Sequence, residues 1–264
     1  MHRLRSISKR VLAAFVFFTR LPFWRLADVG KEDYARVVPL WPLAGWLTGG
    51  IMAAVAGGAL YVGLSAGVAV VLALLCRTLV TGALHEDGFA DFCDGFGGGT
   101  TRERTLAIMK DSHIGTYGVL GLVLYVLLFF NALTTLLQHG VSPLVMVPVD
   151  ALSKWLSSTV LYFLPYARQE SEAKNRLVYA ETPWGERVIS LALGVAPLAL
   201  LYALPIVGVP TPATMGLSLL PPMLGCALLV RTMRRRIGGY TGDCCGATFI
   251  ITEALFYLSL ALFA

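Results

Sequence analysis

Seven apolar runs, each long enough to cross the hydrocarbon core of a lipid bilayer, occupy most of this chain and restrict the folds open to it. The 264 residues are 56% hydrophobic and 14% charged, with a mean hydropathy of +0.71, which is too apolar for a water-soluble domain of this size. Because lipid offers no partner to a backbone N–H or C=O, runs of this length must be helical. We therefore expect an all-α, polytopic integral membrane helical bundle that forms one domain over residues 1–264. The expected spans are 38–62, 64–84, 114–137, 143–165, 187–208, 213–230 and 246–264.

Basic residues gather on one side of these spans. All of the 21 Lys and Arg residues except Arg77 and Lys154 lie in the N-terminal head or in the segments 85–113, 166–187 and 231–236. The positive-inside rule places these segments in the cytoplasm. The net charge of +5 follows from this asymmetry and no nucleic-acid-binding motif accompanies it, so the expected partner is the lipid bilayer and not a nucleic acid.

Two parts of the chain depart from a simple crossing helix. Residues 1–35 begin with a basic head and a short apolar run that Thr19–Pro22 interrupts, which indicates a helix lying on the membrane surface and not a cleaved signal peptide. The Pro and Gly residues of 213–230 leave open whether that segment crosses or re-enters. Within the spans, Asp150 and Lys154 stand one helical turn apart, and this spacing predicts an ion pair inside the bundle.

Negative charge is concentrated in the segment 85–99. Asp87, Asp91 and Asp94 are spaced i, i+4 and i+7, so on a helix their carboxylates lie within roughly 60° of one another. Three like charges on one face need a cation among them. Mg²⁺ is the expected one, because it binds carboxylate oxygens and shares its other positions with substrate phosphate and water. The plainer alternative is a solvated acidic loop.

Glycines and cations follow the acids. The run Gly95–Gly99 is expected to end the acidic helix and to let the backbone approach a ligand. Cations beside a carboxylate-bound metal suit a phosphate or diphosphate substrate, although each of them could instead anchor the next span. The candidate substrate contacts in this region are Gly97, Gly98, Arg102, Arg104 and Lys110.

The other candidate residues are less certain from spacing alone. Asp243 follows a glycine turn and is either a loop cap or a further metal carboxylate. On a helix His85 points roughly opposite to Asp87, so the two share a site only if Gly88 bends the backbone. Aromatic residues such as Trp41 are expected to meet lipid headgroups.

The order of these motifs resembles the adenosylcobinamide-GDP ribazoletransferase (cobalamin synthase) family. The matching residues are His85-x-Asp87-Gly88-x-Ala90-Asp91-x-x-Asp94-Gly95, then Ile108–Ser112 with Gly115 and Gly118, Gly239-x-Thr241-Gly242-Asp243-x-x-Gly246, Phe18–Pro22 and Pro42-x-x-Gly45. Three positions depart from the family pattern: Glu86 replaces an apolar residue, His113 replaces an arginine, and Ser171-Glu172 interrupts an expected Gly-Leu.

The resemblance implies an enzyme that joins adenosylcobinamide-GDP to α-ribazole, or to its 5′-phosphate, with release of GMP and with Mg²⁺ as cofactor. It also implies a multi-pass protein of the bacterial inner membrane with a cytoplasmic active face, and leaves room for a homo-oligomer or a complex with other enzymes of cobalamin assembly. The implied metal ligands are Asp87, Asp91 and Asp94, joined by Glu86 or Asp243. The implied proton acceptor is Asp94 or else His85, and the implied phosphate-binding residues are Arg102, Arg104, Lys110 and Arg168.

Two other functions compete with this interpretation. A CDP-alcohol phosphotransferase of lipid synthesis also places carboxylates at a membrane face, but the residues after Asp87-Gly88 do not have that family's spacing. A membrane cation transporter predicts acids near the bilayer midplane on broken helices, whereas most acids here lie in the expected loops.

Overall fold

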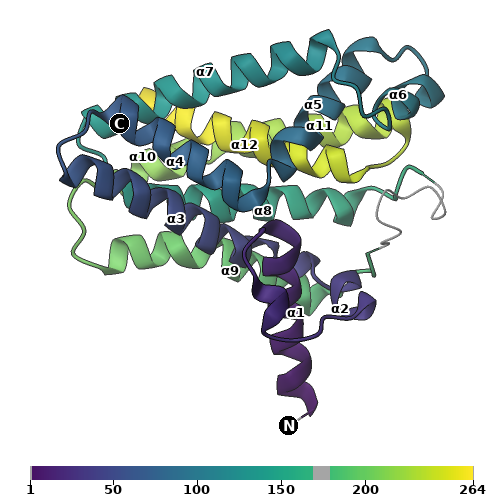
Figure 1. Cartoon of the computed structure of the whole chain (residues 1–264), viewed down its shortest axis with the longest axis horizontal. Coiled ribbons are helices and arrows are strands. Elements are labelled where there is room, and N and C mark those ends of the chain that lie inside the picture. Colours follow the sequence, from purple (N-terminus) through teal and green to yellow (C-terminus); the bar gives the residue numbers. More distant parts are fainter. Residues whose placement is uncertain (1, 169–178, 264) are drawn as a thin grey trace.

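Apart from one isolated bridge between Tyr166 and Tyr240, all regular secondary structure is helical in the computed structural model, which describes residues 2–168 and 179–263 (Figure 1). In chain order the α-helices are α1 (His2–Phe18), α2 (Lys31–Ala35), α3 (Trp41–Tyr61), α4 (Ala66–Thr81), α5 (Leu84–Gly98), α6 (Arg102–Ile108), α7 (Thr116–Gln138), α8 (Met146–Phe163), α9 (Trp184–Ala203), α10 (Pro212–Ser218), α11 (Leu220–Ile237) and α12 (Gly242–Phe263). Short 3-10 helices cover Phe23–Arg25, Val38–Leu40 and Pro143–Val145.

Six segments of the described chain are long and apolar enough to cross a membrane, and a seventh is counted if α4 and α5 form one bent span. The six are Val38–Tyr61, Thr116–Gln138, Pro143–Phe163, Trp184–Ala203, Pro212–Ile237 and Gly242–Phe263. The predicted all-α membrane bundle is therefore confirmed. The segment predicted at 213–230 is part of a longer helical span, in which α10 passes into α11 at Leu219.

The second predicted span differs most from expectation. Instead of one helix over 64–84, α4 ends at Thr81 and the chain turns by 89° into α5. Gly82 and Ala83 both have left-handed backbones, with φ of 66° and 58°, and two such residues in succession cannot continue a right-handed helix. The 16 residues of α4 rise roughly 24 Å, less than the core thickness of about 30 Å. The turn therefore brings the acidic helix into the end of the bundle.

Two helices form the centre of the bundle. The span containing α8 is 78% buried and that of α12 is 61% buried, against 22% for α9, so α9 lies at the periphery. Glycines on α3 permit close contact with α8, because a Cβ on Gly45 would lie 2.6 Å from the Cα of Ala151. Small residues at such contacts are typical of helix packing in membranes.

A buried polar network joins the central helices. Arg77 on α4 donates to both carboxylate oxygens of Glu253 on α12 at 2.6 Å, and to the Tyr125 hydroxyl at 2.5 Å. The predicted ion pair between Asp150 and Lys154 is confirmed, and Thr48 donates to Asp150 at 2.7 Å. Paired in this way, charges can be kept inside the bundle.

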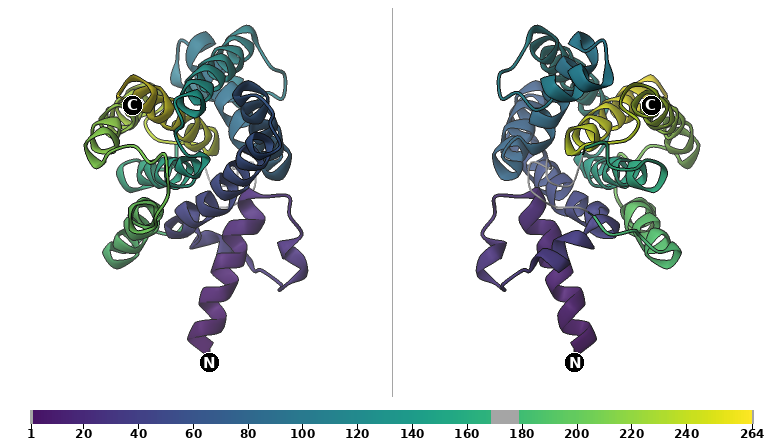
Figure 2. Two further views of the ribbon diagram at one scale, coloured as in Figure 1. Left: turned by 90° about the vertical axis from the view of Figure 1, so that its left-hand side faces the viewer. Right: turned by 90° about the vertical axis from the view of Figure 1, so that its right-hand side faces the viewer.

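The connections separate into two groups at opposite ends of the bundle. The end of α5, helix α6, residues 164–168 and residues 238–241 lie together at one end, whereas the loops at 62–65, 139–142 and 204–211 and the C-terminus lie at the other (Figure 1). Helix α1 runs crosswise to the long helices and extends away from the bundle (Figure 2). This is the orientation of a helix on the membrane surface when the long helices cross the bilayer.

Candidate active site

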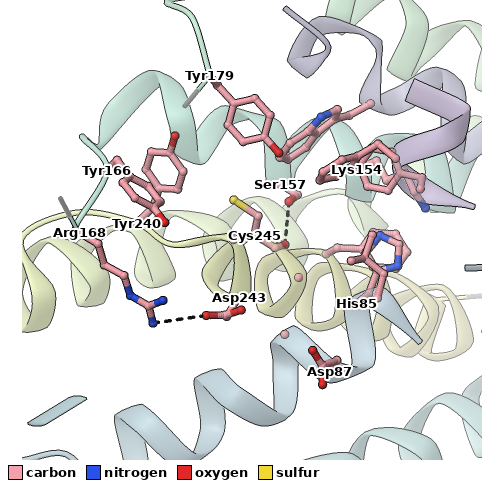
Figure 3. Close-up of a pocket in the computed structure, with 18 residues that line it drawn as sticks. His85, Asp87, Lys154, Ser157, Tyr166, Arg168, Tyr179, Tyr240, Asp243 and Cys245 are labelled. Atoms are coloured by element: carbon pink, nitrogen blue, oxygen red, sulfur yellow. Dashed lines mark hydrogen bonds and ion pairs between the residues drawn. The ribbon is translucent and has the colours of Figure 1, made fainter. Parts of the chain in front are cut away.

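A cavity of about 290 Å³ lies at the end of the bundle that carries the charged connections (Figure 3). The last turn of α1, the start of α3, the first turns of α5 and α12, and the middle of α8 form its walls. The lining residues are Phe17, Phe18, Trp41, Leu84, His85, Asp87, Gly88, Lys154, Ser157, Tyr166, Arg168, Tyr179, Tyr240, Gly242, Asp243, Cys245, Gly246 and Phe249. Concave sites with apolar walls and a few convergent polar groups usually bind small ligands.

Two glycines bring the acidic walls of this cavity together. A Cβ on Gly88 of α5 would lie 3.1 Å from the Cα of Asp243, and a Cβ on Gly246 of α12 would lie 3.1 Å from the carbonyl oxygen of His85. The two backbones can touch only because neither position has a side chain. As a result Asp87 and Asp243, far apart in the sequence, line one cavity (Figure 3).

Backbone pairing holds the loops beside the acids. The Tyr240 N–H donates to the Pro165 carbonyl at 2.9 Å, and the Ala167 N–H donates to the Tyr240 carbonyl at 2.8 Å. Gly239 packs directly on the Pro165 carbonyl, where a side chain has no room. This short pairing places Arg168 next to α12.

Arg168 and Asp243 form a charged pair in the wall, with 3.9 Å between Nη2 and Oδ2. The Arg168 side chain is only 3% exposed, and within the described residues its Nε has no hydrogen-bond partner. A buried guanidinium with an unused donor suits an anionic ligand, because its planar fork matches phosphate oxygens.

Asp87 differs from Asp243 in its surroundings. Asp87 is exposed, and within residues 2–168 and 179–263 its carboxylate makes no hydrogen bond or ion pair. Asp243 is buried, with Arg168 beside it and the Thr241 hydroxyl donating at 3.3 Å. Together they offer two carboxylates to one ligand or metal ion.

His85 also lines the cavity, although α5 is an unbroken helix through Gly88. The expectation that sharing the site requires a bend is therefore wrong. The cavity extends around the first turn of α5, so the buried His85 and the exposed Asp87 reach it from different sides. The His85 ring lies between Phe18, 5.6 Å away, and Phe249, 4.2 Å away between centroids. Both of its ring nitrogens are buried without a partner among the described residues.

Aromatic side chains form the wall opposite the carboxylates (Figure 3). Trp41 is buried here and not at a headgroup surface as expected, because the end of α1 covers it: Phe18 meets it edge-on at 5.5 Å. Burial raises the pKa of Tyr179 well above its usual value and also raises the pKa of Tyr166 and Tyr240. These hydroxyls therefore stay protonated and can donate hydrogen bonds to a ligand.

Asp94 lies apart from this cavity. It is buried beside a second, more open cavity of about 490 Å³, and its two oxygens accept the backbone N–H groups of Gly115 at 2.7 Å and Gly118 at 2.8 Å. These N–H groups begin α7, where a carboxylate satisfies free donors and complements the helix dipole. In this structure Asp94 therefore caps α7.

The remaining predicted ligands do not converge on one ion. Among the described residues, no three His, Cys, Asp or Glu side chains are close enough to hold a metal ion. Glu86 accepts from Arg77 at 3.3 Å, and Asp91 lies between the turns that carry Asp87 and Asp94. Because seven residues of helix rise about 10 Å, Asp87 and Asp94 reach different neighbours although they share a face. Of the predicted metal ligands, Asp87 and Asp243 line the first cavity, whereas Asp94 lines the second.

The residues predicted to bind phosphate are also divided between the two cavities and the loops around them. Arg168 lines the first cavity, whereas Arg104 and Gly98 line the second. Arg102 donates to the carbonyls of Ile237 at 2.8 Å and Ala167 at 2.7 Å. These two hydrogen bonds link the loop after α8 to the end of α11. Lys110 is exposed and lines neither cavity.

Most of the glycine run packs against protein, whereas Gly98 lines the second cavity. Helix α5 continues to Gly98, Gly95 packs on Met109, and a Cβ on Gly97 would lie 2.5 Å from the Tyr117 ring. Arg236 donates to the Gly99 carbonyl at 2.5 Å and so completes the end of α5. The departure at Ser171-Glu172 lies outside the described residues.

Several lining residues were not anticipated from the sequence. An ion pair inside the bundle was the only role predicted for Lys154, and no function was considered for Phe17, Ser157, Tyr179 or Phe249. Only Phe18 carried a signal, because it begins the N-terminal family motif. Phe17, Tyr179 and Phe249 are ordinary aromatic residues, and Lys154 and Ser157 are polar residues within α8. Their place at the cavity depends on how α1, α8, α12 and the loop before α9 pack.

Comparison with known proteins adds independent information. The sequence model of the family described as cobalamin-5-phosphate synthase matches residues 10–261. Relatives named adenosylcobinamide-GDP ribazoletransferase include one from Shewanella amazonensis, 38% identical over 253 residues that cover 95% of this chain and 94% of the relative. Another, from Ralstonia pickettii, is 36% identical over 256 residues, covering 97% of this chain and 96% of the relative. No solved structure matches this chain.

Proposed function

This chain belongs to the cobalamin-5-phosphate synthase family, and on that premise we propose that the cavity between α5 and α12 is its active site. The chain is a transferase of cobalamin synthesis that joins adenosylcobinamide-GDP to ribazole. Membership decides against the CDP-alcohol phosphotransferase and the cation transporter. The observation that carries the assignment is the meeting of Asp87, Asp243 and Arg168 in one cavity.

The proposed reaction is a displacement at phosphorus. A ribose hydroxyl of α-ribazole, or of its 5′-phosphate, attacks the phosphorus nearest the cobinamide in adenosylcobinamide-GDP. The new O–P bond makes a phosphodiester, the bond to the outer phosphate breaks, and GMP leaves. The hydroxyl loses its proton during the attack.

Asp87 and Asp243 are the proposed ligands of Mg²⁺. Two carboxylates are the usual protein share of such a site when substrate phosphates and water supply the other oxygens, so the pair fits this ion. When bound, Mg²⁺ would offset charge on the diphosphate and on the leaving GMP.

Side chains of the chain itself would bind the phosphate and accept the proton of the attacking hydroxyl. Arg168, with its unused Nε donor, would bind a phosphate oxygen beside Asp243. Asp87 makes no hydrogen bond or ion pair within the described residues, so one of its oxygens can take the proton of the attacking hydroxyl. Asp94, the acceptor expected from the sequence, is given a positioning role, because both of its oxygens accept backbone N–H groups.

The test is an assay of the purified protein in detergent. Mixing adenosylcobinamide-GDP, α-ribazole and Mg²⁺ should release GMP, and a chelator should stop the reaction. Asp243→Asn should lower kcat/KM by about a hundredfold or more, the size expected for one preorganised electrostatic group. Glu103→Gln, on the exposed face of α6, is the matched control and should keep full activity. Near-normal turnover by Asp243→Asn would remove this cavity from consideration.

We further propose that the protein lies in the bacterial inner membrane with the cavity open to the cytoplasm. The basic segments surround the cavity end, and the C-terminus lies at the opposite end (Figure 1). A reporter active only outside the cytoplasm should therefore work when fused to the C-terminus and fail when fused after Arg236. The expected association with a second copy or with other enzymes of cobalamin assembly stays a prediction.

A further inference from the structure

The cavity has two chemically different ends (Figure 3). One end holds Asp87, Asp243 and Arg168. The other is aromatic: Trp41 and Tyr179 meet edge-to-face at 5.7 Å, and Trp41 and His85 both pack against the Phe18 ring. The mechanism proposed above uses only the charged end.

Like the indole N–H of Trp41, the His85 imidazole is a buried polar group of the aromatic end with no hydrogen-bond partner among the described residues. It is 3% exposed, it lines the cavity, and neither ring nitrogen has a hydrogen-bond partner among the described residues. Buried polar groups are normally paired, and an unpaired one at a cavity wall points to a ligand that completes it.

Its polar neighbours are already engaged. The Lys154 ammonium pairs with Asp150, donates to Thr48 at 3.1 Å and lies 4.0 Å from the centroid of the Phe249 ring. The Ser157 hydroxyl donates to the Cys245 carbonyl at 2.7 Å. Within the described residues, the aromatic end therefore offers stacking faces, the unpaired His85 imidazole, the unpaired indole N–H of Trp41 and the Tyr179 hydroxyl.

We infer that the aromatic end of the cavity binds the heterocyclic base of ribazole, a planar fused-ring system with one free ring nitrogen, to which an N–H of His85 donates. The base stacks beside Trp41 and Tyr179, and the attached ribose extends to Asp87 and Asp243, where its hydroxyl reacts. This inference rests on the proposed function, because the acceptor nucleoside is defined by that reaction.

Size and polarity favour this occupant over the other parts of the two substrates. At about 290 Å³ the cavity is at the small end of ligand pockets, which suits a nucleoside and leaves the corrinoid ring outside. Guanine presents donors and acceptors along two edges, more than the His85 imidazole, the Trp41 indole N–H and the Tyr179 hydroxyl can pair together.

Binding of α-ribazole to the full chain in detergent, measured by titration calorimetry without adenosylcobinamide-GDP, tests the inference. His85→Ala should weaken binding by about tenfold, as expected for a lost hydrogen bond. His85→Gln, which keeps a side-chain N–H, should restore most of the affinity. Tyr179→Ala should also weaken binding by about tenfold through lost stacking. Tyr61→Ala, on an exposed tyrosine at the other end of the bundle, is the control and should leave affinity unchanged.

The outcomes separate the two proposals. Unchanged α-ribazole affinity in both His85→Ala and Tyr179→Ala overturns the inference, and so does guanosine that displaces α-ribazole with equal affinity. Asp243→Asn should bind α-ribazole normally while losing turnover. If Asp243→Asn retained turnover, the proposed active site would fail whatever the binding data show. If His85→Ala does not fold, the α-ribazole affinity of Tyr179→Ala tests the inference by itself. Tyr179 lies in a loop, so we expect this variant to fold.

Discussion

Asp87 and Asp94 lie about two helical turns apart on the same helix, yet their carboxylates meet opposite surroundings. Asp87 is exposed at a cavity and makes no hydrogen bond or ion pair within the described residues, whereas Asp94 is buried and holds two backbone N–H groups at the start of α7. One acidic motif therefore combines a group available for chemistry with a group used for architecture. A regular spacing of carboxylates shows which residues share one face of a helix. It does not show which neighbouring groups each carboxylate on that face contacts.

The largest expected effect is on the activity of Asp87→Asn. This change should lower kcat/KM by roughly a hundredfold to a thousandfold, because it removes a charge aimed at the reacting groups. The thermal midpoint should stay near that of the wild type, since the carboxylate makes no contact that stabilises the described fold. GMP release and thermal unfolding in detergent measure the two effects. A drop in thermal stability that matched the loss of activity would make Asp87 a structural residue like Asp94.

A second change tests the contact that brings the acids together. Gly88→Ala places a Cβ 3.1 Å from the Asp243 backbone, so α5 and α12 must separate slightly. We expect activity to fall by about a hundredfold, the size associated with small misplacements of reacting groups. Gly57→Ala on α3, where a Cβ meets nothing within 4 Å, is the matched control. Equal activities of the two variants would contradict the role given to this contact.

Asp94→Ala should act mainly on stability. Loss of the cap is expected to lower the free energy of unfolding by about 1–2 kcal/mol. Activity should fall less than in Asp87→Asn, because Asp94 lies outside the proposed reaction cavity. Asp94→Asn, which keeps one acceptor oxygen, should recover part of the stability. If Asp94→Ala were fully stable but inactive, the structural role given to Asp94 would be wrong, and so would its contrast with Asp87.

The smallest effect is expected at Asp111, in the second cavity. A hydrogen bond from His113 lowers the pKa of the Asp111 carboxyl, so any stability that it contributes is present at neutral pH and is lost as the pH falls through the lowered pKa. The His113 and Asp111 side chains are 91% and 57% exposed, and exposed pairs contribute little to stability. Asp111→Asn should therefore leave both the thermal midpoint and its dependence on acid pH unchanged within error. A clear shift would mean that this cavity is more closed in solution.

Much of the architecture could be predicted from local patterns. Hydropathy located the starts of the six long spans to within four residues, although the predicted ends at 208 and 230 miss the observed ends, Ala203 and Ile237. Charge placed the basic segments at one end, because burial in lipid leaves little freedom to a chain of this composition. The turn at Gly82 and Ala83 was missed, since Ala83 does not ordinarily adopt a left-handed backbone. That turn decides the entry of α5 into the bundle.

The candidate residues of the site have surroundings that their residue types did not indicate. Asp87, Asp243, Arg168 and His85 were all candidates, and all four line one cavity. Arg102 was a candidate for the same reason, but its guanidinium is bonded to two carbonyls. A cation beside a loop can bind either a ligand or the backbone, and the choice depends on carbonyl groups that the fold brings near.

The sequence by itself determined an all-helical membrane bundle with its charged connections at one end, because the bilayer imposes length, polarity and backbone bonding on every span. Only the tertiary structure decided which carboxylates face a common cavity. That outcome depends on contacts between residues far apart in the chain, above all the touching backbones at Gly88 and Gly246 and the capture of Asp94 by α7. Such contacts arise from packing, and no local pattern of residues encodes them.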